Sequence, residues 1–147
     1  MEPRLWTRPR RELTQATSAG FEAAEFAQDV LGIALHPWQR WLLIHALELN
    51  PDRTFRFRTV VVEVARQNGK TTLVQVLALW RMFVDGAGLV IGTAQNLDVA
   101  EEAWTGAVEM AEGVPELAAE IASVEITLAR LLALVLLPRQ GRALSVC

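Results

Sequence analysis

Three consecutive residues, Gly69, Lys70 and Thr71, have the types and the spacing to hold a phosphate group. The apolar run Val60–Val64 precedes them and a long apolar stretch follows, so the order predicts a buried strand, a tight loop and the start of a helix. In such a loop the backbone N–H groups point at the phosphates, the lysine adds a positive charge, and the threonine hydroxyl ligates Mg²⁺. We therefore predict a site for a nucleoside triphosphate, formed by Gln67, Asn68, Gly69, Lys70, Thr71 and Thr72.

The loop departs from the usual phosphate-loop pattern at one position. A glycine normally stands five positions before the Gly-Lys pair, and this chain has Val64 there, followed by Ala65-Arg66-Gln67-Asn68. The alternative is an ordinary strand-to-helix turn with a solvated lysine. The β-branched residues before the loop and the apolar stretch after it favour the phosphate site.

The composition indicates one modest globular domain. The chain has 147 residues, of which 52% are hydrophobic and 21% charged. The net charge of −3 argues against a continuous basic surface for nucleic acid, although it leaves room for a local basic face. The single cysteine, Cys147, excludes an internal disulfide and fits a reducing cytoplasm. The N-terminal residues lack a signal-peptide pattern, and the apolar run Ile126–Leu137 is too short to span a bilayer.

The chain divides by composition into three parts. Residues 1–17, rich in arginine and proline, predict a loosely ordered arm. Residues 18–125 alternate helical and strand patterns, and predict part of an α/β domain. Residues 126–147 form an apolar tail, for which an amphipathic helix is the alternative.

Helix signals recur through residues 18–125. Ser18 can cap a helix that stops at Gly32, and Pro37 can start a second helix that ends near Asn50. His45 lies on the apolar stripe of that second helix, which favours a packed histidine over a catalytic one.

Residues 70–84 predict a third helix, and residues 89–93 a second strand, which would pair in parallel with residues 60–64 across a right-handed connection. Asp98, with Glu101 in a capping box, can start a fourth helix, and residues 115–121 predict a short fifth one.

Three stretches, in this order, resemble the large subunit of the tailed-phage terminase. They are Pro37-Trp38-Gln39-Arg40-Trp41, Ala65-Arg66-Gln67-Asn68-Gly69-Lys70-Thr71, and Leu89–Asp98 leading into Ala100–Trp104. The resemblance covers roughly residues 18–125. It implies a partial P-loop three-layer α/β ATPase domain with parallel strands, N-terminal helices and an incomplete sheet, from the ATP-hydrolysing motor of viral DNA packaging. It also implies double-stranded phage DNA, a small terminase subunit and a portal as partners, an oligomeric assembly, and the cytoplasm of a bacterial host.

The same resemblance implies a role for single residues. Gln39 would read the adenine, because an amide can both donate to and accept from a purine edge; a surface glutamine on an amphipathic helix is the alternative. Lys70 would hold the β- and γ-phosphates, Thr71 would ligate the Mg²⁺, and Arg66 would contact the γ-phosphate. Arg66 and Lys70 are therefore the candidate catalytic residues. Gln95 and Asn96, just after the second strand, are further candidates for ligand contact.

The chain lacks the acid that this chemistry needs. Hydrolysis requires an apolar strand ending in a carboxylate that orients Mg²⁺, yet no Asp or Glu follows Glu125, and Pro138 and Arg139 follow the last apolar run. The nuclease carboxylates of the terminase are absent too. We therefore expect ATP binding without hydrolysis by this chain alone, and a reading frame that shifts near Glu125. The alternatives are a fragment of another P-loop motor such as a helicase, and a non-enzymatic prophage remnant or interaction module.

Overall fold

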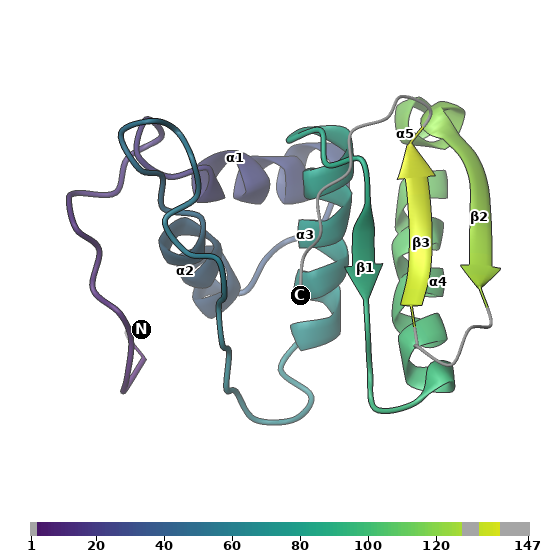
Figure 1. The fold of residues 1–147 in the computed structure, drawn as a ribbon, viewed down its shortest axis with the longest axis horizontal. Coiled ribbons are helices and arrows are strands. Elements are labelled where there is room, and N and C mark those ends of the chain that lie inside the picture. Colours follow the sequence, from purple (N-terminus) through teal and green to yellow (C-terminus); the bar gives the residue numbers. More distant parts are fainter. Residues whose placement is uncertain (1–2, 128–132, 139–147) are drawn as a thin grey trace. The chain divides into compact units, whose positions relative to one another are not determined.

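The computed structural model describes residues 3–127 and 133–138, and side chains as far as Ile121. The chain forms two compact units, Met1–Asn68 and Gly69–Cys147. Figure 1 shows the elements of both, and each unit is described by itself.

The first unit is built on two helices that pack against each other. Helix α1 (Gly20–Glu25) continues as a π-helical turn, η1 (Phe26–Val30), and Gly32 stops it in a left-handed conformation at φ 67°. Helix α2 (Pro37–Ala46) begins at the predicted proline. The two helices approach closely at Gly20, where a Cβ atom would lie 2.2 Å from the carbonyl oxygen of Leu43. The core of this unit consists of Ala23, Ala24, Phe26, Ala27, Leu43, Leu47 and Leu49.

Helix α2 ends at Ala46, four residues before the predicted end near Asn50. Residues 47–49 adopt a bridged arrangement in which Glu48 pairs with Ser18 and Leu49 with Phe55. The N–H group of Leu49 donates to the carbonyl of Thr17 over 2.8 Å. These long-range bonds satisfy backbone groups that another helical turn would have paired locally, and they allow three consecutive side chains to be buried.

The predicted buried strand at Val60–Val64 is not formed. Residues 59–65 belong to no helix or strand, and Val60, Val61 and Val62 are 45%, 89% and 42% exposed. A central parallel strand needs a paired neighbour on both sides, and the backbone of residues 59–63 makes no hydrogen bond within the described part of the chain. The prediction of a parallel strand–helix–strand unit is therefore wrong for its first strand. The P-loop fold class of the whole domain stays a prediction.

In its described residues, the second unit contains three helices and three strands. These are α3 (Lys70–Phe83), β1 (Val90–Gly92), α4 (Leu97–Glu112), α5 (Pro115–Glu120), β2 (Ile121–Thr127) and β3 (Ala133–Pro138). The strands form a sheet in the order β1-β3-β2 with antiparallel pairing; Val90 lies opposite Leu136, and Leu134 lies opposite both Gly92 and Ile126. Helix α3 packs against α4 and β1 around buried Trp80 and Trp104.

The helix predictions of this unit are confirmed at α3, α4 and α5, and the predicted second strand is present as β1. The predicted cap of α4 is wrong by two positions. Asn96, not Asp98, is the capping residue, since its Oδ1 accepts the N–H of Val99 over 3.0 Å. The backbone of Asn96 is extended, with φ −148° and ψ 169°, and this conformation lets its side chain accept the N–H of Val99. Asp98 lies inside the first turn of the helix.

The predicted boundary between residues 125 and 126 falls within β2. Residues 133–138 form β3, so the alternative of a C-terminal helix is wrong there. The rest of the predicted tail, residues 128–132 and 139–147, lies outside the described residues. Over the residues that the structure describes, every helix is too short or too polar to cross a membrane.

Candidate nucleotide-binding site

The N-terminus of α3 is formed by the residues predicted to hold the phosphates. Gly69 is the capping residue in a left-handed conformation, with φ 75° and ψ 24°, and Lys70 is the first residue of the helix. The N–H group of Leu73 donates to the carbonyl of Gly69 over 3.1 Å, so the helical bonds begin at once. The first turn contains no acidic residue, and its Thr71 side chain is exposed. Such a helix end presents backbone N–H groups and a positive partial charge to an anion.

The preceding residues, 65–68, end the first unit in a tight turn. Gln67 has a positive φ of 59°, and Asn68 Nδ2 donates to the carbonyl of Ala65 over a long 3.4 Å. The side chains of Arg66, Gln67 and Asn68 are all exposed. Exposed donors on a turn of this kind are available to a ligand that approaches from solvent.

Gln39 is buried in the first unit, so the alternative of a surface glutamine is wrong. Its side chain is 2% exposed, and its Oε1 accepts the N–H group of His36 over 2.7 Å. The amide thus caps the first turn of α2. Sequence reasoning missed this role, although a glutamine three residues after the capping residue is its known signal.

Gln95 and Asn96 lie in the loop after β1, as predicted. Asn96 is engaged in capping α4, whereas Gln95 is exposed. Their contribution to a ligand site stays a prediction.

Thr71, in the first turn of α3, is the residue whose hydroxyl would ligate magnesium. Over the described residues, no three His, Cys, Asp or Glu side chains come together as a metal site. A single hydroxyl still suits Mg²⁺, because this ion usually keeps several waters and takes its other ligands from the phosphates it accompanies.

The two acids with shifted pKa values lie outside this loop. The hydroxyl and N–H of Thr54 donate to Asp52 over 2.7 and 3.1 Å and lower the pKa of its carboxyl. Burial raises the pKa of Asp85, just beyond α3, and the guanidinium of Arg81 partly opposes that rise. The carboxyl of Asp85 is not placed to polarise a water at the N-terminus of α3, since Asp85 follows the opposite end of that helix.

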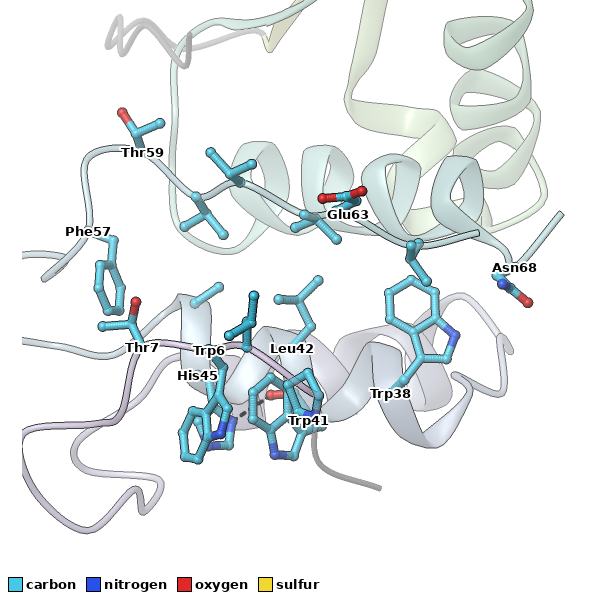
Figure 2. A pocket seen from close by; sticks show the side chains of 17 residues that line it. Trp6, Thr7, Trp38, Trp41, Leu42, His45, Phe57, Thr59, Glu63 and Asn68 are labelled. Atoms are coloured by element: carbon cyan, nitrogen blue, oxygen red, sulfur yellow. Dashed lines mark hydrogen bonds between the residues drawn. The ribbon is translucent and has the colours of Figure 1, made fainter. Parts of the chain in front are cut away.

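The first unit also contains an apolar groove that sequence reasoning missed. The groove has a volume of about 820 Å³ and lies between α2, residues 3–7 and residues 57–64 (Figure 2). Its lining is mainly aromatic and aliphatic, and includes Trp6, Trp38, Trp41, Leu42, Phe57, Val60, Val61, Val62 and Val64. The helical spacing of Trp38, Trp41 and Leu42 was visible in the sequence but indicated only a core-facing stripe.

An aromatic cluster contributes to the lining of this groove. The rings of Trp41 and His45 are stacked with centroids 3.8 Å apart, and Trp6 meets both edge-on at 5.1 Å. His45 Nδ1 donates to the carbonyl of Trp41 over 2.8 Å. The half-buried histidine is thus held by packing and by one hydrogen bond, and Trp6 brings the N-terminal residues into the same cluster.

Comparison with protein-family models, curated proteins and solved structures found no match to this chain.

Proposed function

We propose that this chain binds ATP with Mg²⁺ at the loop of residues 65–72, as a fragment similar to the ATPase part of a terminase large subunit. The observation that supports the proposal is the left-handed Gly69 directly before Lys70 and Thr71 in the acid-free first turn of α3. A helix start of this kind stabilises bound phosphate through its N–H groups and dipole. The lysine at its first position adds a full charge to that site.

Each loop residue has a distinct role in the proposal. Lys70 holds the β- and γ-phosphates, Thr71 ligates Mg²⁺, and Arg66 offsets charge at the γ-phosphate. Backbone and side-chain donors of Gln67, Asn68 and Thr72 complete the cradle. Gln39 would read the adenine only after release from its cap, because its Oε1 already accepts the His36 N–H.

Hydrolysis is not part of the proposal for this chain alone. The sequence supplies no strand that ends in a carboxylate, and a bound triphosphate would lack the group that orients the metal and the attacking water. Within a full motor the same fragment would act with double-stranded DNA, a small terminase subunit and a portal, as an oligomer in a bacterial cytoplasm. A helicase-type motor fragment, or a non-enzymatic remnant, is the alternative.

Calorimetric titration with ATP and Mg²⁺ tests the proposal. We expect saturable binding by the wild-type chain and a loss of at least about tenfold in affinity for Lys70→Ala, because the charge contact to the phosphates is removed. Arg53→Ala is the matched control, since it deletes one exposed positive charge from a different turn.

Two outcomes would contradict the proposal. If wild-type chain and Lys70→Ala bind ATP equally, the loop is not the site; if neither binds, the non-enzymatic alternative holds. Release of inorganic phosphate by the purified chain, lost in Lys70→Ala, would show that a carboxylate elsewhere in the chain completes the active site.

A further inference from the structure

Residues 59–64 have the composition of a β-strand, but they do not form a strand in the structure. It contains four valines among six residues, and the run extends along the apolar groove of the first unit (Figure 2). The exposed fraction alternates, with Val60 at 45%, Val61 at 89% and Val62 at 42%. Side chains of an extended chain alternate in this way when one face is covered.

The main chain of residues 59–63 is unpaired in the part of the chain that the structure describes. The N–H and C=O groups of residues 59–63 make no hydrogen bond with any described residue. Extended backbone with a free row of donors and acceptors is a template for another strand. Water satisfies these groups in the isolated chain, but it leaves the valines exposed.

We propose that residues 59–63 bind an extended β-strand from a separate polypeptide. The incoming backbone would pair with the free N–H and C=O groups, and its alternate side chains would enter the groove beside Trp38 and Leu42 of α2. A small apolar molecule can fill the groove but cannot pair with the main chain. The inference is independent of nucleotide binding.

The charges flanking the valines define the partner further. Arg58 and Glu63 are both exposed, one near each end of the segment. An antiparallel partner would be complementary with a basic residue opposite Glu63 and an acidic residue opposite Arg58. Positions opposite Val60, Val62 and Val64 would be apolar, because these side chains lie on the more covered face. The peptide Val-Lys-Val-Thr-Val-Thr-Glu meets all these conditions.

Calorimetric titration of the full chain with this synthetic peptide tests the inference. Consecutive residues of an extended chain direct their N–H groups to opposite edges, so Val61→Pro and Val62→Pro each block one edge. We expect one of the two variants to weaken binding at least about tenfold, and the matched controls Val61→Thr and Val62→Thr to bind within about twofold of wild type. The charge-reversed peptide Val-Glu-Val-Thr-Val-Thr-Lys should bind more weakly.

A second measurement does not depend on the folding of variants. Two N-methylated forms of the same peptide, one for each set of alternate backbone nitrogens, each block one edge of the strand, so one of the two should lose affinity for the wild-type chain. Failure of the unmodified peptide to bind, or full affinity of both N-methylated peptides, would overturn the inference. A wild-type dimer in light scattering, without peptide binding, would also overturn it and assign the segment to a second copy of the chain.

Discussion

The carboxylate of Glu48 and the guanidinium of Arg56 form a largely buried ion pair in the first unit. Glu48 Oε2 lies 2.6 Å from Arg56 Nη1, and the two side chains are 2% and 13% exposed. The same pair holds the N-terminal segment, because Glu48 Oε1 accepts the N–H of Arg10 over 3.1 Å and Arg56 Nη1 donates to the carbonyl of Arg8 over 3.0 Å. Residues 8–10 are therefore fixed by specific contacts although they form no helix or strand.

Glu48→Ala should lower the free energy of unfolding of the first unit by about 3 kcal/mol, because the variant leaves the Arg56 charge without its buried partner. Urea denaturation followed by tryptophan fluorescence measures this change. Glu12→Ala is the control, since the Glu12 side chain is exposed. If Glu48→Ala lowers the free energy of unfolding no more than Glu12→Ala does, the ion pair makes no net contribution to stability.

Gly92→Ala should destabilise the second unit by about 2 kcal/mol, because the new methyl group overpacks a filled core. A Cβ atom at this position would lie 2.2 Å from Nε1 of the buried Trp104 indole. Gly113→Ala is the matched control, since a Cβ there would meet its nearest atom, the carbonyl oxygen of Met110, at an ordinary 3.4 Å. Equal melting temperatures of the two variants would show that β1 moves away from α4 without cost.

Two substitutions in the phosphate loop should change stability in opposite directions. Gly69→Ala places a side chain at φ 75° and should cost about 1 kcal/mol, whereas Gln67→Gly removes one at φ 59° and should be neutral or stabilising. Urea midpoints of both variants compare the two positions. Destabilisation by Gln67→Gly that exceeds that of Gly69→Ala would show that contacts of the Gln67 side chain outweigh backbone strain.

Bound ATP should protect Lys70 from chemical acylation. Lys70 is the only lysine of the chain, so a lysine-selective reagent labels this side chain and the N-terminal amine alone. With ATP and Mg²⁺ the rate of labelling at Lys70 should fall at least about fivefold, while the N-terminal rate serves as the internal control. Mass spectrometry after proteolysis reports both. Equal rates with and without ATP would place the phosphates away from Lys70.

Two aspartates should give stability profiles of opposite slope in acid. The folded pKa of Asp52 is lowered, so its stabilising contribution is present above the unfolded value of 3.8 and is lost as the pH falls through the folded pKa. The folded pKa of Asp85 is raised, so its contribution is complete below 3.8 and is lost as the pH rises through the folded pKa.

Unfolding free energies of Asp52→Asn and Asp85→Asn between pH 2.5 and about 6 test this pair. Relative to wild type, Asp52→Asn should become less stable as the pH rises, and Asp85→Asn more stable. If the stability differences of the two variants from wild type change with pH in the same direction, the pKa of Asp85 is not raised by burial against the opposing influence of Arg81.

Local signals predicted the helices well because the determinants lie within a few residues. Pro37 begins α2, Gly32 ends the first helical segment, and Gly69-Lys70 marks the start of α3. The cap of α4 was misplaced because both Asn96 and Asp98 are good capping residues, and only the backbone conformation selects one of them.

The sequence by itself determined the positions of the helices, the tight loop with Gly69 at the candidate phosphate site and the apolar character of residues 60–64. Only the tertiary structure decided whether that apolar run pairs as a strand, because strand pairing depends on partners distant in the chain and not on propensity. It also decided that Gln39 is buried in a cap and that Glu48 meets Arg56 and Arg10. The contact between Arg10 and Glu48 joins residues 38 positions apart, so no local pattern predicts it, whereas the Gln39 cap joins residues three positions apart and has a local signal.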